Sequence, residues 1–162
     1  SDLSRNIGIA QGTIYIYFES KEELFREILR VADSSEMIKK MKLLVAMPIS
    51  AEKKLRMLSE TVLRRLAEEE SFAAMIALNT QMLLEKNEAY SSEETTYQTK
   101  LYNYTAKLIE QGQREKSMAD GSSMKLADYY WGVVYLYSLK RLFTSKYEMI
   151  SVEDLERTLL KG

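Results

Sequence analysis

The chain has 162 residues, of which 46% are hydrophobic and 29% charged, and its formal net charge is −1. This balance is typical of a globular protein and excludes a disordered segment. One proline, six glycines and no cysteine favour an all-α fold and exclude disulfides and thiolate zinc sites. There is no apolar run long enough to span a membrane and no basic-then-apolar leader, so we expect a cytoplasmic protein.

The first residues predict two short helices around a tight turn. The residues before Gly8 resemble the last turns of an amphipathic helix, and Gly8 ends it because glycine reaches left-handed conformations cheaply. A short helix follows at about 11–17, with Ile14 and Phe18 on its inner face. Two short helices around a glycine turn are typical of a helix-turn-helix unit.

The next segments continue the helical pattern. Ser20 and Glu23 form a capping box that begins a helix extending to about residue 33. An apolar face resumes at Met37 and ends before Pro48. Ser50 caps a further helix, whose inward stripe is Leu55, Leu58, Val62 and Leu66.

The second half of the chain predicts helices of increasing apolarity. Residues 72–84 are apolar on nearly all sides, which places that helix inside its domain. Ser92 begins a helix that ends near Gly112, and a short last helix begins at Ser151. The helix at about 124–144 is the most apolar, and it has more large apolar side chains than one buried face can hold. Such a helix needs a second hydrophobic neighbour, usually a partner subunit.

Catalytic chemistry is poorly supported. The chain contains no histidine and no cysteine, and it has no glycine-rich phosphate loop or nucleophile elbow. The run Glu68-Glu69-Glu70 could hold a hard cation, but adjacent helical residues point in different directions, which favours a solvated helix end. We therefore predict no enzyme activity, no metal and no cofactor.

Residues 8–24, with the sequence GIAQGTIYIYFESKEEL, resemble the DNA-binding end of the TetR family of bacterial transcriptional regulators. The resemblance covers about residues 3–31. It implies a partial helix-turn-helix domain with its connecting helix at 1–33, followed by a helical ligand-binding and dimerisation domain at 34–162. Ala10 departs from the family, which usually has a serine or threonine cap there, at a cost of roughly 1 kcal/mol. The family's first helix is not in this sequence, so we expect only part of a DNA-binding unit.

The resemblance also implies contacts to double-stranded DNA. By position, the family's phosphate and base contacts fall on Gln11, Gly12, Thr13, Tyr15, Tyr17 and Lys21. A glutamine can pair with an adenine edge, while hydroxyls and a lysine can bind phosphate. The alternative is that the two tyrosines only fill a small helical corner. The charge gives no support for DNA, because the first thirty residues hold four basic and five acidic side chains.

The family resemblance implies a ligand-responsive repressor. As a homodimer it would set two recognition helices about 34 Å apart on a palindromic operator. In the family, a small molecule in the body shifts the helix after the capping box, here 20–33, and releases the DNA. The alternative is a helical protein–protein interaction module without DNA binding.

Two sets of residues in the body are candidates for these roles. A pocket for a small apolar or amphipathic effector would be lined by flexible and aromatic side chains, although such residues more often form plain core; the candidates are Met41, Met57, Met75, Met82, Tyr104 and Trp131. The last two long helices are suited to pairing, and the candidates for the dimer interface are Leu108, Gly132, Tyr135, Leu136 and Leu139.

Overall fold

The computed structural model describes residues 34–85 and 92–162. Within these ranges the chain forms the helices α3 (Ser34–Ala46), α4 (Ala51–Glu68), α5 (Glu70–Glu85), α6 (Ser92–Arg114), α7 (Ser123–Phe143) and α8 (Val152–Glu156). The described part contains no strand, only one isolated bridge between Met118 and Leu160. The all-α prediction is therefore confirmed. None of the described helices is long and apolar enough to cross a membrane.

Serine caps fix several helix starts. The Ser50 hydroxyl accepts a hydrogen bond from the Lys53 amide at the start of α4, and the Ser151 hydroxyl accepts one from the Asp154 amide at α8. Both caps were predicted from the sequence, because a hydroxyl in this position satisfies an amide that has no partner within the helix. Ser122 caps α7 in the same way.

The end of α6 differs from the prediction. The helix does not stop at Gly112 but continues to Arg114, and the left-handed residue that follows is Lys116, with φ of 61°. Gly112 has a different role, because a Cβ there would lie 2.4 Å from the Met118 side chain. Its carbonyl also accepts hydrogen bonds from the amides of Ser117 and Met118. The glycine therefore permits a close return of the chain onto α6.

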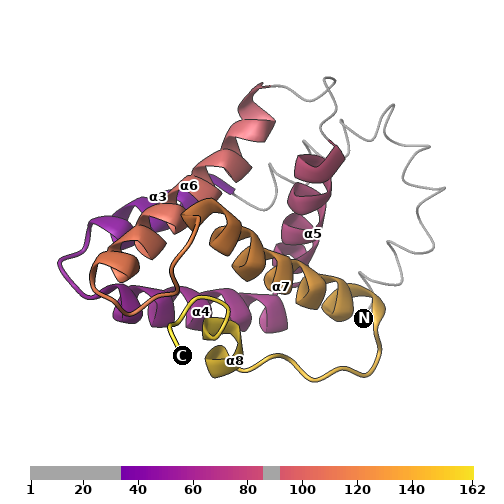
Figure 1. Ribbon diagram of the computed structural model, residues 1–162. Helices are drawn as coiled ribbons and strands as arrows, with labels where there is room; N and C mark the ends of the chain where they lie inside the picture. The colour runs from indigo at the N-terminus through magenta and orange to yellow at the C-terminus, as the bar shows by residue number, and fades with distance from the viewer. Residues whose placement is uncertain (1–33, 86–91) are drawn as a thin grey trace.

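Helix α7 lies at the centre of the described part. It packs against α4, α5, α6 and α8, while α3 lies beside α6 and α8 packs on α4 (Figure 1). Helix α5 is buried along residues 72–77, as its all-round apolar pattern predicted. The inner face of α7 thus joins the helical layers into one core.

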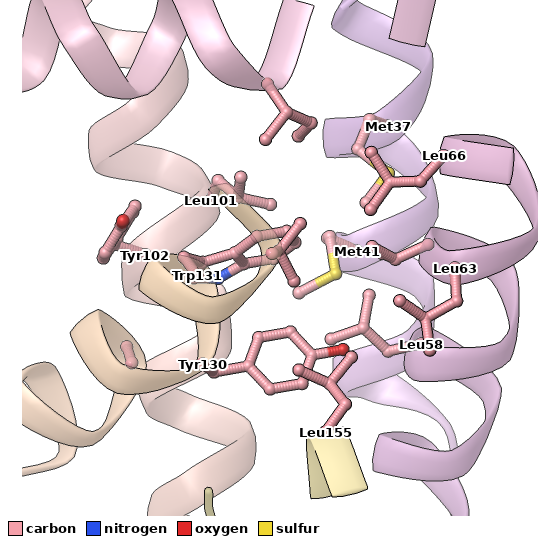
Figure 2. Close-up of a cluster of buried hydrophobic side chains, with 14 of the residues drawn as sticks. Met37, Met41, Leu58, Leu63, Leu66, Leu101, Tyr102, Tyr130, Trp131 and Leu155 are labelled. Atoms are coloured by element: carbon pink, nitrogen blue, oxygen red, sulfur yellow. The ribbon is translucent and has the colours of Figure 1, made fainter. Parts of the chain in front are cut away.

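The core is built around two adjacent aromatic residues of α7. Tyr130 and Trp131 are buried and meet edge to face with ring centroids 5.1 Å apart. Figure 2 shows them facing aliphatic and methionine side chains of α3 and α4. Their polar atoms are also satisfied, since the Tyr130 hydroxyl lies 3.0 Å from that of Ser59 and Trp131 Nε1 donates to Thr105 Oγ1 at 3.0 Å. Burial of each such ring contributes roughly 1.5–3 kcal/mol.

The C-terminal helix α8 is held to α4 by one arginine. The Arg56 guanidinium lies 3.0 Å from a carboxylate oxygen of Glu153 and 3.0 Å from one of Glu156. Burial raises the pKa of the Glu156 carboxyl, although Arg56 opposes the shift. The pKa of Glu153 is lowered by its own backbone amide and by Arg56. This ion-pair cluster fixes the end of the chain against the body.

Candidate functional site

The six predicted DNA contacts lie outside the described residues. Gln11, Gly12, Thr13, Tyr15, Tyr17 and Lys21 all precede Ser34. They therefore stay predictions. The described element nearest to them in sequence is α3, which begins at Ser34.

A groove of about 250 Å³ lies between α3 and α4, and it is open to solvent. Four of its nine lining residues are methionines, and the only polar ones are Lys40 and Thr61; the set is Met37, Lys40, Met41, Leu43, Leu44, Met47, Met57, Leu58 and Thr61. Leu43 is 69% exposed and Met57 is 43% exposed. An open apolar surface of this kind typically marks a binding site.

Two parallel stripes on α3 build this groove. Met41 and Leu44 are buried and form its floor together with Leu58 of α4. Lys40 directly precedes Met41, and Leu43 directly precedes Leu44; these two residues form the rim of the groove. Because helical residues three or four apart share a face, α3 presents an apolar stripe to the core and a partly apolar stripe, with one lysine, to solvent.

The structure divides the predicted pocket residues among different places. Met41 and Met57 both line the groove. Met75 and Trp131 are buried in the core, and Tyr104 is half-buried with the Lys107 ammonium 5.6 Å from its ring centroid. The side chain of Met82 lies outside the described part. The six residues therefore do not line one pocket.

A buried lysine fixes the far end of α3. Lys54 is only 2% exposed, and its Nζ donates to the Val45 carbonyl at 2.7 Å and to Gln111 Oε1 at 2.7 Å. The Glu115 carboxylate accepts the amide of Ala51 at 2.9 Å, at the start of α4. This network ties the turn between α3 and α4 to the end of α6. The sequence indicates this network only weakly, because its one sign is that Lys54 lies at an inward position of α4, where a charged residue is unusual.

Asn79 on α5 is a second buried polar residue that the sequence reading missed. It is 1% exposed, and neither its carboxamide nitrogen nor its oxygen has a hydrogen-bond partner among the described residues. The neighbouring Thr80 is satisfied by the carbonyl of Ile76. A buried polar group without a partner costs roughly 1–3 kcal/mol. Asn79 therefore offers a buried donor and acceptor that no described side chain or backbone group uses.

The outward face of α7 is apolar. Tyr129, Leu136 and Phe143 are all more than two-fifths exposed and recur at spacings of seven residues, with Gly132 between the first two. A Cβ at Gly132 would meet nothing within 4 Å, so the protomer gives no packing reason for a glycine there. A glycine within a helix costs about 0.5–1 kcal/mol relative to alanine.

The residues predicted to form the dimer interface come from α6 and α7, and the structure exposes some of them and buries others. Gly132 and Leu136 lie on the exposed face of α7, and Tyr135 and Leu139 are half-buried beside it. Leu108 was assigned wrongly, because it is fully buried within the protomer and cannot reach a partner. The stripe of α6 that carries it points into the core.

The described residues contain no group of three or more His, Cys, Asp or Glu side chains that could hold a metal ion. Tyr102 is the one described residue whose pKa is raised to about 12, chiefly by burial and secondarily by the charge of Asp128. It stays protonated over the physiological range.

Comparisons with known proteins connect this geometry to a class. Residues 1–28 match the family model of bacterial regulatory proteins of the tetR family. A solved structure from Mesorhizobium loti MAFF303099, assigned to the TetR-family transcriptional regulators, covers 91% of this chain and 73% of its own, with 19% identity and a TM-score of 0.50. At this identity the likeness establishes the fold alone. No curated protein matches the chain.

Residues 1–28 are thus similar to the N-terminal part of bacterial regulatory proteins of the tetR family, and the helical fold of the chain is similar to that of the Mesorhizobium loti protein.

Proposed function

We propose that this regulator is a repressor that binds a palindromic operator as a homodimer and leaves it when a small apolar or amphipathic effector binds the body. The proposal divides the chain into a DNA-binding part at 1–33 and an effector-binding and dimerisation part at 34–162. The observation that carries it is the open apolar groove against α3, since α3 directly follows residues 1–33.

The effector would act through α3. A ligand in the groove contacts α3 on one side and α4 on the other, so it stabilises one separation of the two helices. Lys54 and Gln111 hold the far end of α3, so we propose that a shift of α3 appears at its other end, toward residues 1–33. A change there alters the distance between two recognition helices, and the operator accepts only one distance.

The homodimer would form through the outward face of α7. Tyr129, Leu136 and Phe143 supply exposed apolar area, and Gly132 allows a second backbone to approach. The outward residues of α6 at Asn103, Lys107 and Glu110 are exposed and polar. They fit the rim of such an interface better than its centre.

DNA contact would come from Gln11, Gly12, Thr13, Tyr15, Tyr17 and Lys21, in a cytoplasmic protein without enzymatic activity. The test is operator binding by the full-length protein at several salt concentrations. Lys21→Ala removes one phosphate contact, so the salt slope falls by about 0.9 and affinity drops for all sequences alike. Tyr17→Phe weakens binding less.

The matched control is Lys146→Ala, which removes an exposed lysine just after α7 and leaves operator binding unchanged. The repressor proposal would be wrong if the full-length protein does not bind DNA at low salt. That result would favour the alternative, a helical interaction module that uses the same α7 face for a protein partner.

A further inference from the structure

We propose that the groove between α3 and α4 binds a short single-chain amphiphile with an anionic headgroup, whose tail lies on the methionines and whose head lies at Lys40. This inference rests on the proposed effector response, and it names the chemical class of the effector.

The size and lining of the groove set the apolar part of the ligand. Its volume of about 250 Å³ lies just below the ~300–1,000 Å³ of typical drug-sized pockets, so the ligand is small. Methionine side chains are unbranched and adapt to a flexible chain, whereas a rigid ring system needs fixed walls. Met37, Met41, Met47 and Met57 make up nearly half of the lining. A short alkyl chain fits this surface.

Lys40 sets the charge of the head. Among the described residues, it is the only charged one that lines the groove, and no described carboxylate lines it. Its Nζ lies 3.0 Å from Glu36 in a pair that is more than half exposed. Exposed pairs of this kind are worth little, so Lys40 can exchange Glu36 for a ligand anion at small cost. A cationic head could not replace Glu36 at the Lys40 ammonium, so it would gain no ion pair with a residue that lines the groove.

A protein partner fits this groove less well than a small molecule does. Stable protein interfaces involve about 20–30 residues on each side, whereas nine residues line the groove. The only other polar lining residue is Thr61, so a peptide backbone would find few hydrogen-bond partners there.

The test is isothermal titration calorimetry on the full-length protein with three eight-carbon probes: octanoate, 1-octanol and octyltrimethylammonium. We expect saturable binding of one octanoate per chain, weaker binding of octanol, and the weakest binding of the ammonium probe. Lys40→Gln should weaken octanoate about two- to fivefold, as expected for an exposed charge pair, and leave octanol unchanged.

Met57→Glu gives the sharper test, because it puts a carboxylate beside the tail and should weaken octanoate at least about tenfold. The matched control is Met124→Glu on α7, since Met57 and Met124 are equally exposed, at 43% each. The control should bind octanoate as the unaltered protein does, and circular dichroism should show both variants folded.

Two results would overturn the inference: octanoate binding that Met57→Glu leaves intact, or an ammonium probe that binds as tightly as octanoate. Operator release is measured separately. If octanoate binds at this groove but does not weaken operator binding, the inference stands and the effector part of the proposed function fails. If octanoate does not bind while the operator is still recognised, the inference fails and DNA binding stands.

Discussion

The body exposes two apolar surfaces that differ in shape and in the side chains that form them. The groove between α3 and α4 is concave, rich in methionine and bordered by a lysine. The outward face of α7 follows one helix, carries Tyr129, Leu136 and Phe143, and has a glycine between the first two of these residues. Flexible side chains in a hollow suit a small ligand of variable shape. Aromatic and aliphatic side chains along a helix suit a second protein surface. The exposure of an apolar surface therefore does not by itself show whether the surface binds a small ligand or a protein.

The largest effect should come from a charge on the α7 face. Leu136 is 48% exposed, so Leu136→Glu is tolerated by the protomer fold but buries a carboxylate wherever two such faces meet. We expect the dimer to weaken by at least ~2 kcal/mol, as for a central interface residue. Light scattering at micromolar concentration measures this.

The matched variant for this comparison is Leu43→Glu at the rim of the groove, where the leucine is 69% exposed. It should leave the dimer intact. If both variants stay dimeric, or if the unaltered protein is a monomer, the α7 face is not the pairing surface.

An intermediate effect should follow from breaking the network at the end of α3. Lys54→Met keeps the aliphatic stem but leaves the Val45 carbonyl and Gln111 Oε1 without their donor. We expect the free energy of unfolding to fall by about 1–3 kcal/mol in denaturant titrations. Lys53→Met is the control, because the neighbouring Lys53 is exposed and its loss should change little. Equal effects of the two substitutions would contradict the role of Lys54.

The smallest effect should come from Gly132→Ala. The added methyl group meets nothing in the protomer, so it should stabilise α7 by about 0.5–1 kcal/mol under conditions where the protein is dissociated. At concentrations where the dimer forms, the same methyl group should weaken association if Gly132 brings two backbones together. Thermal unfolding measured across a series of protein concentrations separates the stabilisation of α7 from the weaker association. A uniform gain at all concentrations would exclude Gly132 from the interface.

Local patterns predicted much of the architecture. Ser50 and Ser151 were recognised as caps because a helix start depends on a few neighbouring residues. The all-round apolar pattern of 72–84 predicted a buried helix, and residues 72–77 are buried. The resemblance to a family came from residues 8–24, whose type-restricted positions fall within one short stretch, and a family model matches residues 1–28. These features are all encoded in adjacent residues.

The functional surfaces depended on which helices meet. Periodicity places Leu108 on an apolar stripe but cannot say whether that stripe faces the core or a partner, and the fold buries it. The predicted pocket residues share a chemical type, yet only Met41 and Met57 come together, because α3 packs beside α4 at that point.

The sequence by itself determined most of the helices, two of their caps and the family resemblance of the first residues, since hydrogen bonds within a helix and a short sequence motif are local. Only the tertiary structure decided that Lys54 is buried against the end of α3, that Gly112 makes room for Met118, and that α7 has one face in the core and one in solvent. These depend on contacts between residues far apart in the chain, and no local pattern specifies such contacts.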